Sequence, residues 1–99
     1  AINSAKKSVV FIFPAFHPPH NWQEELAYFA NQLLSSKIFS EYGVSFTIVD
    51  DGSKIPLKTP DLPLPLQMVR HKANRGKGAA LRTGIKLSHA DFYFLYDVD

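Results

Sequence analysis

Four short runs of β-branched and aromatic residues recur along the 99-residue chain, and each one ends at a turn or loop. The runs occupy residues 8–13, 44–49, 66–69 and 92–96. Runs that are mostly apolar, rather than alternately apolar and polar, are typical of strands buried on both faces. Two predicted helices and one long loop separate the runs, and such connections join parallel strands. The sequence therefore predicts an α/β fold, a Rossmann-like parallel sheet of about four strands with flanking helices.

The segments between the runs have their own signals. Asn21 stands where it would cap the first helix, with Glu24 in the position of a capping box. The apolar stripe that follows at helical spacing consists of Leu26, Phe29, Ala30, Leu33, Leu34 and Ile38. The second predicted helix, residues 79–88, contains Gly84, and its cost of about 1 kcal/mol relative to alanine suggests close packing there. Residues 54–65 contain four prolines and are predicted to form an irregular crossover over the surface.

Composition excludes several classes of protein. The formal charge of +2 on 99 residues is too even to favour nucleic acid or an anionic membrane as a partner. The absence of cysteine excludes disulfides and thiolate metal sites and fits a reducing compartment. No apolar run approaches the ~20 residues that span a bilayer. We therefore predict a location on the cytoplasmic side and no nucleic-acid partner, and membrane association of a longer parent protein stays open.

Polar residues and glycines collect after each predicted strand. The carboxyl ends of parallel strands lie on one edge of an open sheet, and ligands bind at that edge. We therefore expect four segments that are distant in the sequence to border a single cleft. These segments are residues 14–17 after the first strand, Asp50 and Asp51 after the second, His71, Asn74, Arg75 and Lys77 after the third, and Asp97 and Asp99 after the fourth.

The residue types in this predicted cleft suit a particular ligand. Asp97 and Asp99 are one residue apart in an extended segment, so both carboxylates can face the same side, and hard oxygen ligands suit Mg²⁺ or Mn²⁺. Residues 76–78, Gly-Lys-Gly, open a helix whose backbone N–H groups attract phosphate. Asp50 and Asp51 have no basic neighbour in sequence and can accept hydrogen bonds from a nucleoside. A nucleoside diphosphate with a divalent cation matches all three features.

Each of these features also has a plainer interpretation. Asp97 and Asp99 could be solvated acids after a strand, residues 50–53 could be an ordinary turn, and residues 76–78 could start a helix without a ligand. The spacing around Lys77 is neither that of a P-loop nor that of the dinucleotide-binding fingerprint. The predicted nucleoside diphosphate site therefore depends on all these motifs occurring together and not on any one of them.

The histidines and the large aromatic residues are interpreted conservatively. His17 and His20 have His-x-x-His spacing, but no further zinc ligand lies near them in sequence. His71 and His89 are interpreted as surface histidines. The residues predicted to belong to the core rather than to a sugar-binding platform are Trp22, Phe29, Tyr93 and Phe94.

The four motifs in register resemble glycosyltransferase family 2, the large inverting family with the GT-A fold. Residues 10–16 look like its first strand and Pro-Ala-aromatic turn, and residues 48–53 look like its Val-Asp-Asp-Gly-Ser motif. Residues 74–84 are similar to the Asn-x-Gly-Lys-Gly-x-Ala…Gly segment, in a form frequent in enzymes that transfer glucose or mannose to polyprenyl phosphates. Residues 94–99 look like the strand that ends in Asp-x-Asp. Order and approximate spacing agree from Ser8 to Asp99.

The resemblance implies a role for each motif. The residues implied to bind the nucleotide sugar are Pro14, Ala15, Phe16, Asp50, Asp51, Asn74, Gly76, Lys77, Gly78 and Asp97. Residues 14–16 would line the base and ribose pocket, the two acids of the second motif would hold the base, and residues 74–78 would shape the donor site. Asp97 would reach the ribose or the metal, and Asp99 would bind Mg²⁺ or Mn²⁺ at the diphosphate.

The resemblance also implies what these 99 residues lack. The family's acceptor site and catalytic base lie beyond Asp-x-Asp, so we expect residues 1–99 to be the donor-binding part of a longer glycosyltransferase, with no catalytic residue of their own. The acceptor, a polyprenyl phosphate or a saccharide, is not identified, and neither are the sugar and the base. The family usually has Asn-Glu after the aromatic residue of the first motif, whereas His17 and Pro18 follow here. That carboxylate contact is not carried over.

We expect the 99 residues alone to bind nucleotide weakly and to transfer no sugar. An incomplete sheet would expose apolar surface and an unpaired strand edge, which predicts self-association or low stability. Two other classes of function stay open at this point. One is a non-catalytic nucleotide-binding α/β module, and the other is a small α/β interaction domain whose acids and glycines only form turns.

Overall fold

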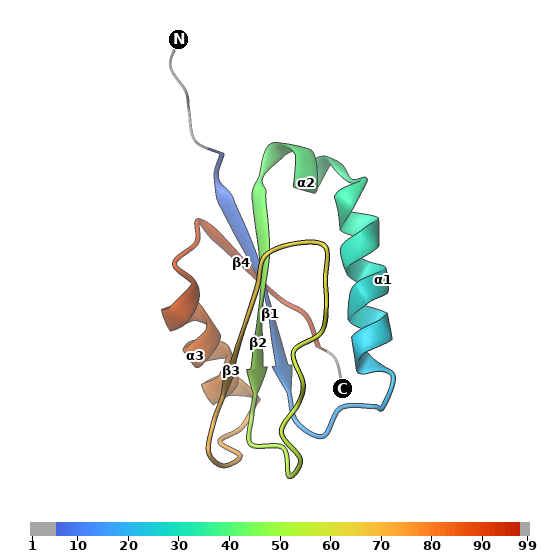
Figure 1. Cartoon of the computed structure of the whole chain (residues 1–99). Coiled ribbons are helices and arrows are strands. Elements are labelled where there is room, and N and C mark those ends of the chain that lie inside the picture. The colour runs from blue at the N-terminus through green and yellow to red at the C-terminus, as the bar shows by residue number, and fades with distance from the viewer. Residues whose placement is uncertain (1–5, 98–99) are drawn as a thin grey trace.

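The computed structural model describes residues 6–97, which form a four-stranded sheet and three helices (Figure 1). The elements in chain order are β1 (Ser8–Ala15), α1 (Trp22–Leu34), α2 (Lys37–Glu41), β2 (Gly43–Asp50), β3 (Leu66–Arg70), α3 (Lys77–Ser88) and β4 (Phe92–Leu95). The strand order is β3-β2-β1-β4, and every neighbouring pair is parallel. This arrangement confirms the predicted α/β, Rossmann-like fold.

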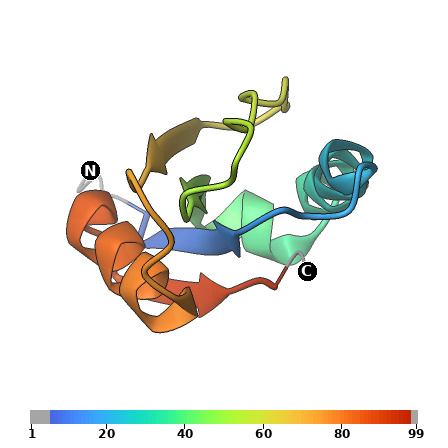
Figure 2. The ribbon, with the colours of Figure 1, turned by 90° about the horizontal axis from the view of Figure 1, so that it is seen from below.

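Helices cover the two faces of the sheet (Figure 2). On one face, α1 packs its buried stripe against a cluster that includes Phe11, Phe13 and Phe46. On the other face, α3 packs Ala80 against Val10, Ile12 and Val49. Alternate residues of β1 thus enter two different cores, which explains why this strand is apolar throughout.

Gly84 lets α3 lie close to β1. A Cβ atom added to Gly84 would lie 2.6 Å from Cγ2 of Ile12, which is itself fully buried. The close packing predicted from a helical glycine is therefore confirmed. Toward the other end of the helix, Lys77 at the start of α3 lies near Pro14 and Ala15 at the end of β1.

Two details of the predicted helices are wrong. Asn21 precedes α1, but its side chain makes no capping hydrogen bond, because its backbone lies at φ −96° and ψ 18° rather than in the extended region that a side-chain cap needs. The chain enters the helix instead through a hydrogen bond from the Trp22 N–H to the Pro19 carbonyl, 3.0 Å. The short helix α2 was not predicted, and it is capped by Ser36, which accepts from the Phe39 N–H.

The prolines between β2 and β3 form the predicted irregular crossover, which lies over the α1 face of the sheet. Leu64 is buried there, and Leu57 and Leu62 pack against the cluster that contains Phe13. The crossover therefore closes this core in addition to connecting two strands.

The aromatic residues near β4 differ in their surroundings. Tyr96 packs against Phe13, with ring centroids 5.1 Å apart, and against Phe29 at 4.5 Å, which places it on the α1 face. Phe94 was predicted to belong to the core, but 49% of it is exposed. The reason is that β4 pairs only with β1 among the described residues and forms the edge of the sheet.

Candidate functional site

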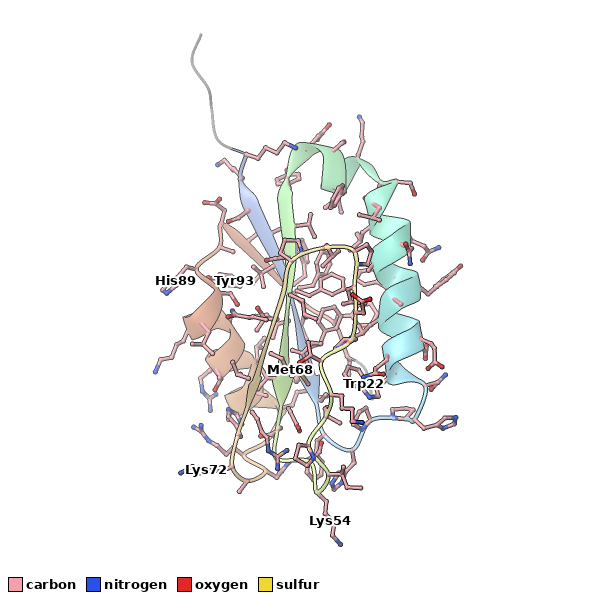
Figure 3. The ribbon with its side chains drawn as sticks, viewed as in Figure 1. Trp22, Lys54, Met68, Lys72, His89 and Tyr93 are labelled. Carbon is pink, nitrogen blue, oxygen red and sulfur yellow. The ribbon has the colours of Figure 1, made fainter. Side chains whose placement is uncertain are left out.

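A pocket of about 210 Å³ lies at the carboxyl edge of the sheet. Its lining residues are Pro14, Ala15, Phe16, Asp51, Asn74 and Lys77. All six belong to the set that the motifs single out. They come from the end of β1 and the residue after it, from the loop after β2, and from the turn between β3 and the start of α3. The loops of this edge meet at the bottom of the molecule in Figure 3, where Lys54 and Lys72 extend into solvent. The expected convergence of the first three motifs is thus a feature of the structure, whereas the ligand stays a prediction.

Asp51 is the most heavily bonded residue of the pocket. Its Oδ1 accepts hydrogen bonds from Nδ1 of His71 at 2.6 Å and from the Arg75 N–H at 2.9 Å. Its Oδ2 accepts from the Gly76 N–H at 2.8 Å and from Nδ2 of Asn74 at 3.1 Å. The residue is only 3% exposed. One carboxylate at the end of β2 therefore holds the whole turn that leads into α3.

These contacts determine the charge of Asp51. Burial opposes ionisation and acts to raise the pKa of Asp51. The hydrogen bonds from His71, Arg75 and Gly76, together with the charge attraction of His71, outweigh burial and lower the pKa below its ordinary value of 3.8. Since the carboxylate is ionised at neutral pH, it can only accept, and Nδ1 of His71 must carry a proton.

His71 was interpreted as a surface histidine, and this interpretation is wrong. The side chain is only 7% exposed, and it bridges Asp51 and the hydroxyl of Thr83 on α3, with 2.8 Å between Nε2 and Oγ1. The parallel pairing of β2 and β3 sets Asp50 opposite Arg70, and so brings the next two residues, Asp51 and His71, side by side. The sequence places His71 after the third strand, but only this register would have indicated that it pairs with Asp51.

Asp50 faces away from the pocket. Its carboxylate accepts from the Ser53 N–H at 2.9 Å, from the Leu57 N–H at 3.0 Å and from Nη1 of Arg70 at 2.8 Å. Burial acts to raise the pKa of Asp50, but the hydrogen bonds from Leu57, Ser53 and Arg70 lower it below the ordinary value. Although no base is near Asp50 in sequence, Arg70 is its partner across the sheet. The structure therefore does not bring Asp50 to the pocket beside Asp51.

Gly52 allows the loops after β2 and β3 to touch. Its φ is +79°, and a Cβ atom added there would lie 2.4 Å from the carbonyl carbon of Ala73. Only glycine satisfies both conditions at once. The Asp-Asp-Gly sequence thus combines two bonded carboxylates with a position where two backbones meet.

Lys77 and Asp97 form an ion pair at the mouth of the pocket. The Nζ and Oδ2 atoms are 2.5 Å apart, and 47% and 48% of the two side chains are exposed. Gly76 precedes this lysine with φ +99°. Gly78, also among the predicted residues, lies in the first turn of α3 and is exposed. The pair brings the third motif next to the start of the fourth.

The predicted metal ligands are only partly described. Asp99 lies outside residues 6–97, and within that range no three His, Asp or Glu side chains gather as metal ligands. Asp97 supplies one half-exposed carboxylate, which is bonded to Lys77 of the pocket lining. Mg²⁺ and Mn²⁺ are commonly held by one or two carboxylates together with substrate phosphate, so the donor type fits such an ion.

His17 connects the loop after β1 with the loop after β2. Its backbone N–H donates to Oγ of Ser53 at 3.0 Å, and its ring Nε2 accepts from the Lys54 N–H at 2.8 Å. The residue has φ +46°, and its ring stacks on Phe16 with centroids 4.0 Å apart. His17 is therefore engaged in the packing of these two loops against each other.

No helix within residues 6–97 has the length and apolar character needed to cross a membrane. No protein-family model matches the chain, and no curated protein sequence matches it significantly.

Proposed function

We propose that the pocket between Phe16, Asp51 and Lys77 binds the nucleoside diphosphate of a nucleotide sugar. We further propose that these residues belong to a metal-dependent inverting glycosyltransferase that resembles family 2. The observation that carries the proposal is that three motifs, separated by at least twenty residues in each case, border one pocket at the carboxyl edge of a parallel sheet. The three motifs appear in the order and spacing that the resemblance implies.

Three of the pocket residues are proposed to contact the ligand directly. Phe16 offers an exposed aromatic face on which a base can stack. Asn74 donates from Nδ2 to Asp51, which leaves its amide oxygen as an acceptor for base or ribose. Lys77 supplies positive charge for the phosphates at the pocket mouth.

The contacts of Asp51 change the role that the resemblance implies for it. A carboxylate offers about four lone-pair sites, and four hydrogen bonds from the protein already use them. A base that bonded to Asp51 would have to displace one of these donors. We therefore propose that Asp51 acts chiefly by holding the turn at residues 74–76 in place, so that Asn74 and Lys77 face the ligand.

The metal would be held by Asp97 together with Asp99. When bound, Mg²⁺ or Mn²⁺ would supply neutralising charge for the diphosphate. Lys77 and Asp97 are bonded to each other in the structure, so a phosphate and a divalent ion would replace this ion pair and give each side chain a new partner of opposite charge. Among residues 6–97 we assign no catalytic base, and we propose that sugar transfer requires the longer protein.

The test is a titration of the chain with UDP and with GDP, with and without Mn²⁺, followed by ¹H–¹⁵N spectra. We expect metal-dependent binding that shifts the amide signals of Phe16, Asn74 and Lys77. Lys77→Met, which keeps the side-chain length and removes the charge, should weaken binding about tenfold, the effect of losing one charge-assisted hydrogen bond. Lys72→Met is the matched control, since Lys72 is exposed at the same edge but does not line the pocket. If Lys77→Met and Lys72→Met weaken binding equally, or if the nucleotide shifts only amide signals outside the pocket, the proposed binding site is rejected.

A further inference from the structure

We propose that His17 is a proton-sensitive latch between the loops after β1 and β2, and that it sets the position of Phe16 in the pocket wall. The proposal starts from the bond between the Lys54 N–H and Nε2 of His17, 2.8 Å. A backbone N–H can only donate, so Nε2 must be the unprotonated nitrogen of a neutral ring. The closed latch therefore requires the tautomer in which Nδ1 carries the hydrogen.

Protonation of the ring reverses this contact. A histidinium ion has N–H groups at both nitrogens and no acceptor, so two donors would face each other where one bond existed. The latch is thus present at a pH where His17 is neutral, and it opens as the pH falls and the ring takes up a proton. The bond from the His17 N–H to Ser53 does not depend on the charge of the ring. It remains as a pivot around which the ring can turn away.

The charges around His17 do not compensate a protonated ring. The groove of about 610 Å³ that His17 shares with Trp22 and Pro56 is lined by the titratable residues His20, Lys54 and Lys58, and none of its described lining residues is acidic. In the loop after β2, the Ser53 N–H donates to the carboxylate of Asp50, which is also bonded to Leu57 and Arg70. The described residues that line this groove therefore offer no carboxylate to hold the charged ring in the closed position.

The latch reaches the pocket through Phe16. The rings of Phe16 and His17 stack at 4.0 Å with 30° between their planes, and Phe16 lines the pocket. His17 also has a positive φ of 46°, which is uncommon for a residue other than glycine and is maintained by contacts on both sides. When the ring leaves Lys54, the stacked Phe16 loses the partner that positions it. Acidification should therefore alter the wall that the proposed function assigns to the base.

The first test of the latch uses the chain without nucleotide. In ¹⁵N spectra at pH 8, the chemical shift of Nε2 of His17 should be that of an unprotonated nitrogen. As the pH falls, the Lys54 and Phe16 amide signals should move with the same midpoint as the His17 ring. Exchange of the Lys54 amide with D₂O, corrected for the intrinsic pH effect, should become about fivefold faster when the ring is charged, as expected for one lost hydrogen bond.

Two substitutions separate the latch from general effects of pH. His17→Gln places an amide oxygen near the position of Nε2, so the Lys54 amide should stay protected at every pH. His17→Ala should leave that amide unprotected at every pH. His20→Gln is the matched control, because His20 lines the same groove but is not the residue that accepts from the Lys54 N–H. In this variant the Lys54 amide should respond to pH as it does in the unmodified chain. If the exchange rate of the Lys54 amide changes neither with pH nor in His17→Ala, the proposed latch is rejected. A Phe16 signal that does not follow the His17 ring would overturn its link to the pocket.

The link to ligand binding rests on the proposed function. If UDP or GDP binds, affinity should fall about fivefold on acidification in the unmodified chain and stay level in His17→Gln, by the same single-bond reasoning. An affinity that falls equally in both would overturn the regulatory part. If neither nucleotide binds, the proposed function fails, while the ligand-free spectra still decide whether the latch exists.

Discussion

Replacing Asp51 by alanine removes the acceptor of four hydrogen bonds at once. Bonds to a charged group contribute roughly 1.5–3 kcal/mol each, and their plain sum would exceed the stability of many domains of this size. The exposure of two of the donors reduces the expected loss. Asn74 and Arg75 are exposed, so their N–H groups can turn to water, whereas His71 is buried and cannot. We expect the free energy of unfolding to fall by about 3 kcal/mol, near the lower bound for breaking a buried ion pair.

Equilibrium unfolding in urea measures this loss, and its pH dependence identifies the cause. The pKa of Asp51 is lowered in the folded state, so its contribution is complete above the unfolded pKa of about 3.9 and is lost as the pH falls through the lower, folded pKa. The difference between the unmodified chain and Asp51→Ala should therefore have its full value at pH 6 and shrink below pH 4.

Asp51→Asn and Asp61→Asn complete the test. Asparagine keeps the shape of Asp51 but turns an NH₂ group toward N–H donors, so it should lose nearly as much stability as alanine. Asp61 is an exposed acid in the crossover, and its replacement should stay within about 0.5 kcal/mol of the unmodified chain. A loss below 1 kcal/mol for Asp51→Ala at pH 6, or full rescue by asparagine, would refute the account of Asp51 as the residue that holds the turn.

Three further substitutions test the packing around the site. Gly84→Ala places a methyl group 2.6 Å from Ile12 and should lower the free energy of unfolding by about 1 kcal/mol, since overpacking outweighs the gain in helix propensity; a more stable variant in urea would contradict the close packing. Gly52→Ala combines φ +79° with a clash at the Ala73 backbone and should cost about 3 kcal/mol, measured as a lower melting temperature, and an unchanged melting temperature would reject it. His71→Phe keeps a buried ring, loses both of its hydrogen bonds and should cost about 2 kcal/mol in urea, whereas a neutral result would mean that the bridge contributes only shape.

The fold could be predicted because its signals are local. The apolar run of β1 indicates burial on both faces by itself, and parallel strands follow from helical or long connections. The absence of the predicted cap at Asn21 could not be foreseen, because it depends on the backbone angles of φ −96° and ψ 18°, which the residue type does not specify. Likewise, the exposure of Phe94 depends on which strand lies at the edge of the sheet, and the sequence of β4 does not contain that information.

The pocket could be predicted in outline because strand direction alone brings the carboxyl ends together. Phe16, Asp51 and Lys77 meet for that reason. Their bonding partners could not be predicted, since His71 reaches Asp51 only through the register of β2 and β3, and His17 reaches Lys54 only through a positive φ. The topology of the sheet determines which segments lie near each other in the site. Which side chains form hydrogen bonds depends on strand register and on single backbone angles.

The alternation of side chains at a strand end explains why two adjacent acids follow β2. Asp50 ends the strand and Asp51 follows it, so their carboxylates point in different directions and bind different loops. Asp50 holds the loop that contains Ser53 and Leu57, and Ser53 in turn accepts from His17; Asp51 holds the turn that carries Lys77. The two walls of the pocket are thus fixed separately, from a single rigid strand. Loss of Asp50 should therefore disturb the Phe16 wall and leave the Lys77 wall in place, and loss of Asp51 should do the opposite.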